Sequence, residues 1–262
     1  NHYACRLFYS ILSNIADVKL FFFNSIWDKN TEDFINEYIQ DEAPDLIAIS
    51  LLTFELGLCN KLVKAVRRLR TSGETKIIFG GPYTFLAAES CLSIADFVCT
   101  GEGEYTLVEI CNEFNKSKKW ENVSLDHIPN LLYLQNNYVH KSDIQDFYYS
   151  RPYIDTLPFP AYGEEGICIY DGIKWQGDIS IKNDFYYAFA SRGCPYMCSY
   201  CINAVHKMRK ITLRSPNKVI EELRAILTKN PNLKTINFID EIFCWDGKWA
   251  KEFGRLYKEQ IA

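Results

Sequence analysis

The fold of this chain is decided by the stretch Ser191-Arg192-Gly193-Cys194-Pro195-Tyr196-Met197-Cys198-Ser199-Tyr200-Cys201. Its three cysteines have the spacing CxxxCxxC on one loop, so their thiolates can close around one [4Fe–4S] cubane. Three protein ligands for four irons leave one iron that a small molecule can chelate. We therefore predict a cluster held by Cys194, Cys198 and Cys201, with one open coordination position.

The cysteine loop is also compatible with two simpler roles. A structural zinc site needs four ligands, usually in two close pairs. Here there is one CxxC pair, and the fourth ligand would have to be His206, Cys168 or Cys244. The three cysteines could also be unrelated buried residues, although the glycine and proline in the loop are not typical of an apolar segment.

The remaining seven of the ten cysteines are scattered along the chain without the spacing of a disulfide framework. Several of them, such as Cys59, Cys99 and Cys111, stand in apolar surroundings, where cysteine acts as a small hydrophobic residue. We therefore expect a reducing, cytoplasmic environment and one thiolate site.

Charge and hydropathy exclude some kinds of partner. The net charge of −4 gives no general reason to expect nucleic acid or an anionic membrane. The basic run Lys207-Met208-Arg209-Lys210 is typical of a solvated face. The longest apolar stretch, Leu20–Phe23, is far shorter than the ~20 residues of a membrane span, and no secretory signal is visible. We expect a protein with no nucleic-acid partner and no membrane span.

Residues 1–115 alternate short apolar runs with segments of helical periodicity. One such segment places Leu62, Val66 and Leu69 on one face, and another places Leu107, Cys111 and Phe114 together. This alternation predicts an α/β domain with a doubly wound, Rossmann-like parallel sheet covered on both faces. The predicted strands are 18–23, 46–50, 76–79 and 97–99.

Residues 116–185 are predicted to be a connector with little regular structure. Within it, the apolar runs 130–134 and 138–140 flank Gln135-Asn136-Asn137, which predicts a β-hairpin with asparagines at the turn. The two prolines of Leu157-Pro158-Phe159-Pro160 favour an extended path.

The α/β pattern resumes over residues 186–262. A strand is predicted at 186–190, before the cysteine loop. A helix then begins with Ser215 as N-cap and Pro216 at its first position, with Val219, Leu223 and Ile226 on its apolar face. The next strand, 235–239, ends at Asp240-Glu241.

The cysteine loop resembles that of radical S-adenosylmethionine (SAM) enzymes, in which the open iron binds the amino and carboxylate groups of SAM. An electron from the cluster, supplied by a donor such as flavodoxin or ferredoxin, then cleaves SAM to a 5′-deoxyadenosyl radical. The resemblance implies that Tyr200 lies against the adenine of SAM and that Asp240 and Glu241 hold its amino group. The alternatives are core packing for Tyr200 and a solvated strand end for the acidic pair.

The amino-terminal half resembles the cobalamin-binding domain that precedes the radical SAM core in one subfamily. Three segments carry the resemblance, 45–50, 80–83 and 101–104. Each stands where a strand gives way to a loop, and ligands of open parallel sheets bind at such ends. Glycine there lets backbone amides approach a bulky ligand. The resemblance continues through 157–160 and Arg214-Ser215-Pro216. It implies that cobalamin contacts ten residues of the three segments and their surroundings: Ser50, Leu51, Thr53, Gly80, Gly81, Pro82, Tyr83, Gly101, Glu102 and Gly103.

Two departures from the subfamily pattern matter. The signature DxHxxG is absent, which argues against a histidine ligand to cobalt and leaves open that the sheet is only a scaffold or a partner-binding module. The 77 residues from 186 to 262 hold two or three βα units at roughly 30 residues each, whereas the family's partial barrel needs about six. We therefore expect a start of the radical SAM core, in a fragment lacking both ends or in a degenerate relative.

The leading hypothesis is a cobalamin-dependent radical SAM methyltransferase acting on an unactivated carbon of a small-molecule or peptide substrate. The same radical could instead serve ring formation, rearrangement or epimerisation. A non-catalytic metal-binding fragment is the alternative from another class.

Overall fold

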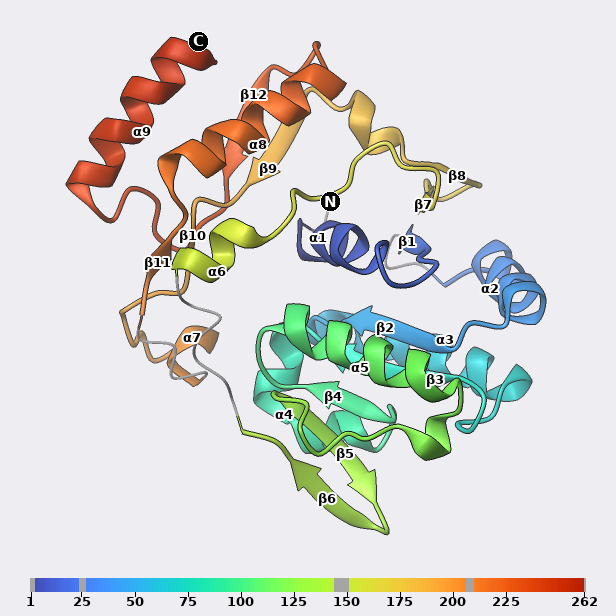
Figure 1. The fold of residues 1–262 in the computed structure, drawn as a ribbon. Helices are drawn as coiled ribbons and strands as arrows, with labels where there is room; N and C mark the ends of the chain where they lie inside the picture. Colours follow the sequence, from blue (N-terminus) through green and yellow to red (C-terminus); the bar gives the residue numbers. More distant parts are fainter. Residues whose placement is uncertain (1–2, 24–26, 144–150, 206–209, 262) are drawn as a thin grey trace.

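The computed structural model describes residues 3–23, 27–143, 151–205 and 210–261. Two α/β units lie on either side of the amino-terminal helix α1, Tyr3–Leu12 (Figure 1). None of the helices in the described part of the chain is long and apolar enough to cross a membrane.

The amino-terminal unit is built on a five-stranded sheet with the order β2-β3-β4-β5-β6. The first three strands are parallel, and the last two form an antiparallel hairpin on the edge of the same sheet. Asn136 and Asn137 form its turn at φ values of 52° and 65°, as a type I′ turn requires. The predicted hairpin is confirmed, and it extends the parallel sheet into a mixed one. The strands are β2 Leu46–Ser50, β3 Lys76–Gly80, β4 Phe97–Cys99, β5 Leu131–Gln135 and β6 Tyr138–Lys141.

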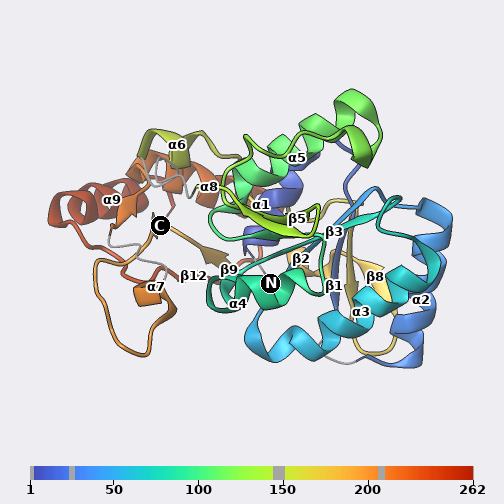
Figure 2. The same cartoon turned by 90° about the horizontal axis from the view of Figure 1, so that it is seen from below.

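Helices cover both faces of this sheet, as the periodicity predicts (Figure 2). Alternation along β3 divides the core: Ile77 and Phe79 pack towards α3 and α4, and Ile78 packs towards α5 and α1. Helix α2 packs on α3. These helices are α2 Lys29–Glu42, α3 Leu56–Leu69, α4 Pro82–Leu92 and α5 Gly103–Ser117.

The strand predicted at 18–23 does not join this sheet. It forms β1, Leu20–Phe23, which pairs in parallel with β7, Ile167–Tyr170, in a three-stranded sheet completed by β8, Trp175–Gly177. Phe21 packs edge-on against Phe34, Tyr38 and Trp175. The expectation that the strand at 18–23 belongs to the parallel sheet of the amino-terminal unit is therefore wrong, because its hydrogen-bonding partner comes from the connector.

The carboxyl-terminal unit begins with β9, Phe185–Ala188, which pairs in parallel with β12, Thr235–Phe238. Helix α8, Pro216–Lys229, connects them, and the Ser215 hydroxyl accepts the N–H of Lys218 as the predicted N-cap. Helix α9, Gly247–Gln260, packs beside α8 over a shared apolar core. The predicted βα pattern is confirmed here. A short helix, α6 Arg151–Thr156, lies in the connector before this unit.

Candidate functional site

The base of the cysteine loop is closed by two short strands, β10 (Ser191–Arg192) and β11 (Thr212–Leu213), which pair antiparallel. Gly193 follows β10 at a φ of 80°, and a Cβ atom there would lie 2.1 Å from the carbonyl oxygen of Lys210. Glycine allows this close approach of two backbone segments. The loop is therefore held at its base, while the cysteines lie beyond it.

The three cysteines of the loop are free thiols. Cys198 is exposed, and Cys194 and Cys201 are half-buried. No three His, Cys, Asp or Glu side chains among the described residues are arranged to hold a metal ion. The donor set fits a cubane with one open iron, because it offers three accessible thiols on a single loop.

The residues considered as a fourth zinc ligand lie in different places. Cys168 is in β7, on the opposite side of the molecule from the short helix α7, Ile202–Val205, that follows the loop (Figure 1). Cys244 is exposed after β12. His206 lies outside the described residues.

The predicted SAM contacts have different surroundings. Tyr200 is 90% exposed, so the alternative of core packing is wrong. The carboxylate of Asp240 accepts the N–H of Ala190, at 3.0 and 3.1 Å, and the hydroxyl of Ser191. Burial raises the pKa of Asp240 despite these hydrogen bonds. Asp240 therefore ties the end of β12 to the β9–β10 turn, whereas Glu241 is exposed.

The predicted cobalamin contacts meet at the carboxyl edge of the five-stranded sheet. Ser50 lies beside Gly80 in the parallel register. The N–H of Leu51 donates to the carbonyl of Gly80 at 2.8 Å, and the N–H of Tyr83 donates to the carbonyl of Leu51 at 3.2 Å. Gly81 has a φ of 92°, and a Cβ there would lie 2.8 Å from the Leu51 nitrogen. The β2 and β3 loops are thus joined by backbone contacts that require glycine.

The side chains at this edge are not equally accessible. Leu51 is 0% exposed and belongs to the core, so it offers a ligand only its backbone. Thr53 and Pro82 are exposed. At this edge Leu51 therefore offers its backbone, whereas Thr53, Pro82 and the half-buried Tyr83 offer side chains.

The third predicted segment, Gly101-Glu102-Gly103, is shaped by a residue that sequence reasoning missed. Asn130 has a φ of 60°, and its amide donates to the carbonyl of Glu102 at 3.2 Å. A Cβ on Gly101 would lie 2.5 Å from the side chain of Asn130. Asparagine directly before a strand was the available signal, because it adopts left-handed backbone more readily than most non-glycine residues.

The cysteine loop and the sheet edge are in contact. The Arg192 guanidinium donates to Glu102 at 3.0 Å and also to Glu104. Burial lowers the pKa of Arg192, but the carboxylates of Glu104 and Glu102 outweigh it and raise that pKa. On a second side, α7 contacts α4, whose first residue is Pro82 (Figure 2). The structure thus brings together two sites that the sequence treats separately, and sequence reasoning missed Arg192 and Glu104.

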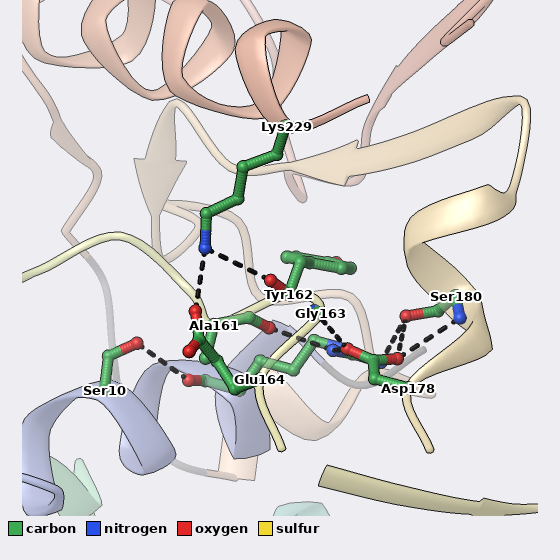
Figure 3. A network of polar contacts seen from close by, with 9 residues as sticks. Ser10, Ala161, Tyr162, Gly163, Glu164, Asp178, Ser180 and Lys229 are labelled. Carbon is green, nitrogen blue, oxygen red and sulfur yellow. Dashed lines mark hydrogen bonds and ion pairs between the residues drawn. The ribbon is translucent and has the colours of Figure 1, made fainter. Parts of the chain in front are cut away.

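Helix α1 is held to the connector by a buried ion pair. The Arg6 guanidinium donates to both oxygens of Asp178, at 2.6 and 2.9 Å, and both side chains are 0% exposed. Ser180 and the N–H of Gly163 complete the network around the carboxylate (Figure 3). The Tyr162 ring lies over the guanidinium at 4.1 Å. Helix α1 also packs on α5 of the sheet, so it connects the connector to the sheet.

A second buried cluster joins α1 to the carboxyl-terminal unit. Glu222 pairs with Arg214 at 2.7 Å and accepts hydrogen bonds from the hydroxyls of Tyr186, at 2.7 Å, and Tyr3, at 3.2 Å. Arg214 belongs to the segment Arg214-Ser215-Pro216, through which the sequence resembles the cobalamin-dependent subfamily, and Glu222 lies in the helix α8 that follows it. Their place in the structure is in the core, where they hold α1 and α8 together.

Comparison with known proteins connects this geometry to a family. Residues 17–111 match the family model described as "B12 binding domain". An uncharacterized methyltransferase of Pyrococcus horikoshii is 26% identical over 260 residues, which cover 96% of this chain and 51% of that protein. Cytidylyl-2-hydroxyethylphosphonate methyltransferase of Streptomyces wedmorensis is 23% identical over 251 residues, covering 87% of this chain and 46% of that protein. The chain thus spans about half the length of these relatives.

Solved structures share the fold. OxsB, a cobalamin-dependent S-adenosylmethionine radical enzyme with aqua-cobalamin and S-adenosylmethionine bound, superposes with a TM-score of 0.75 at 18% identity over 100% of this chain and 35% of its own. The radical S-adenosylmethionine methyltransferase TsrM of Kitasatospora setae, with cobalamin and a [4Fe-4S] cluster bound, has a TM-score of 0.70 at 15% identity, covering 98% of this chain and 48% of its own.

Proposed function

We propose that the protein methylates an unactivated carbon with SAM and cobalamin, because residues 17–111 match the B12 binding domain model and the chain has the fold of cobalamin-dependent radical SAM enzymes. One observation carries the proposal: the CxxxCxxC loop lies against the carboxyl edge of the B12-binding sheet, through Arg192 on Glu102 and Glu104. Two reactive centres that exchange a substrate must be close, and this contact brings the two loops side by side.

In this proposal, Cys194, Cys198 and Cys201 hold the cluster. Bound cluster and SAM would supply a 5′-deoxyadenosyl radical, and cobalamin would supply the methyl group. The exposed Tyr200 is free of core packing and so available to the adenine of SAM. The exposed Glu241 is available to its amino group, while Asp240 orders the turn from which the loop departs.

Cobalamin would lie on the carboxyl edge of β2, β3 and β4. Its contacts would come from Ser50, from the backbone of Leu51 and from Thr53 after β2. The loops after β3 and β4 would complete the site with Gly80, Gly81, Pro82, Tyr83, Gly101, Glu102 and Gly103. Gly81 and Gly101 pack against Leu51 and Asn130, so the absence of a Cβ lets these loops lie close to the sheet edge.

The test is reconstitution of the full chain without oxygen, with iron, sulfide and cobalamin, followed by reduction and SAM. We expect the optical and EPR signals of a [4Fe–4S] cluster, bound cobalamin, and 5′-deoxyadenosine among the products. A colourless protein with one zinc per chain would contradict the proposal and favour the non-catalytic fragment.

Methyl transfer is separated from the alternative radical reactions by SAM carrying a labelled methyl group. Label recovered on cobalamin or on a carbon acceptor supports methyl transfer. 5′-Deoxyadenosine without label transfer favours ring formation, rearrangement or epimerisation. An electron donor such as flavodoxin or ferredoxin would replace the chemical reductant in the cell.

A further inference from the structure

The contact between Arg192, Glu102 and Glu104 joins two parts of the chain that lie far apart in sequence. Arg192 belongs to β10, at the start of the cysteine loop. Glu102 is the N-cap of α5, and Glu104 lies in its first turn. The side chains of Arg192 and Glu102 are 20% and 23% exposed, and that of Glu104 is 4% exposed. The ion pairs are therefore shielded from water, which strengthens them relative to surface pairs.

The backbone around this contact is rigid on both sides. Gly193 is packed against the carbonyl of Lys210, so Arg192 starts from a fixed strand. Gly101 is packed against the side chain of Asn130, which also holds the carbonyl of Glu102. A planar guanidinium that donates to two carboxylates fixes direction as well as distance. The orientation of one loop is thereby transmitted to the other.

We propose that Arg192 is a positioning residue. It sets the separation between the cysteine loop and the carboxyl edge of the five-stranded sheet. The consequence for catalysis rests on the proposed function, whereas the mechanical link between the two loops does not. Without the guanidinium, the carboxylates of Glu102 and Glu104 lose their shared cation and repel each other. The two loops then keep only the contact between α7 and α4, which does not fix the direction of β10, although each loop keeps its own ligands.

The first test needs no cofactor. Hydrogen exchange is measured on the full chain for Arg192→Gln and for a matched control, Arg255→Gln, which removes an exposed guanidinium paired with Glu252 and Glu259 in α9. We expect amide exchange to rise about tenfold in both 99–106 and 193–201 for Arg192→Gln, with no change there in the control. Faster exchange in only one of the two segments, or in neither, would overturn the link.

The second test measures the separation in the reconstituted protein. Pulsed dipolar EPR between the reduced cluster and cob(II)alamin should give a narrow distance distribution for the natural protein and a broad one for Arg192→Gln, at unchanged iron and cobalamin content. Arg255→Gln serves as a comparison, because it removes exposed ion pairs within α9 without touching either loop. An unchanged distribution in Arg192→Gln would overturn the positioning role.

A charge exchange completes the design. Arg192→Glu combined with Glu102→Arg keeps the total charge of the three side chains. We expect this double variant to restore much of the protection from hydrogen exchange, and much of the narrow distance distribution, that Arg192→Glu alone loses. Failure of rescue together with normal behaviour of Arg192→Gln would contradict the proposal. A protein that binds no cobalamin would instead contradict the proposed function, while the hydrogen-exchange result would still decide the link between the loops.

Discussion

Arg6 and Asp178 lie 172 residues apart in the chain and form a bidentate ion pair in which both side chains are fully buried. The pair fixes α1 against the connector, next to the sheet formed by β1, β7 and β8. A buried charge that loses its partner is costly, since neither water nor another ion replaces it.

Asp178→Asn should therefore lower the free energy of unfolding by about 3–5 kcal/mol at pH 7, since it leaves the Arg6 guanidinium buried without a counter-charge. The measurement is urea unfolding followed by circular dichroism. Asp184→Asn is the matched control, because Asp184 is 63% exposed and its partner Lys234 is 3.8 Å away. That control should change the stability by less than about 1 kcal/mol. Equal effects of the two substitutions would contradict the importance of the buried pair.

The same pair predicts a pH dependence. Burial alone would raise the pKa of Asp178, but hydrogen bonds from Arg6, Ser180 and Gly163 lower it overall. A carboxyl whose folded-state pKa is depressed stabilises the fold above its unfolded pKa of about 3.9 and loses that contribution as the pH falls through the folded value. The difference in unfolding free energy between the natural protein and Asp178→Asn should be constant near neutral pH and shrink below about pH 4. A difference that grows towards acid would contradict this assignment.

Gly81 offers a test of the sheet edge. Its φ of 92° and ψ of 177° belong to a region that only glycine adopts easily, and a Cβ would collide with the backbone of Leu51. Gly81→Ala should cost about 1–3 kcal/mol of stability and weaken binding of hydroxocobalamin, followed by optical titration. Gly57→Ala in α3 is the control, since a Cβ there meets nothing within 4 Å, and it should stabilise the helix by about 0.5–1 kcal/mol. Unchanged cobalamin affinity in Gly81→Ala would argue against this loop as part of the site.

The cysteine loop can be tested one thiol at a time. Cys194→Ala, Cys198→Ala and Cys201→Ala should each abolish the cluster, measured as iron and acid-labile sulfide per chain after anaerobic reconstitution. Cys244→Ala is the informative control, because this thiol is exposed and was a candidate fourth ligand. It should retain its iron in full. Loss of metal in Cys244→Ala would indicate a site fully ligated by protein, which leaves no open position for SAM.

Local patterns predicted much of the structure. Ser215 and Pro216 place the start of α8, because an N-cap hydroxyl and a residue without an N–H satisfy the first turn of a helix by themselves. Asn136 and Asn137 define a hairpin turn for the same local reason. The partner of β1 could not be predicted in this way. Its apolar residues are compatible with any sheet, and its pairing with β7 is accompanied by packing of Phe21 and Phe23 on Trp175, a residue distant in sequence.

The sequence by itself determined which reactive and ligand-binding groups are present. These are three thiols at the spacing of a cluster loop and glycine-rich strand ends suited to a bulky ligand. These are properties of neighbouring residues and need no fold to be recognised. Only the tertiary structure decided that Arg192 meets Glu104 from 88 residues away and that Asp240 is held by the backbone of Ala190. The physical reason is that pairing of distant charges depends on which surfaces the packed core brings together, and no spacing along the chain records that.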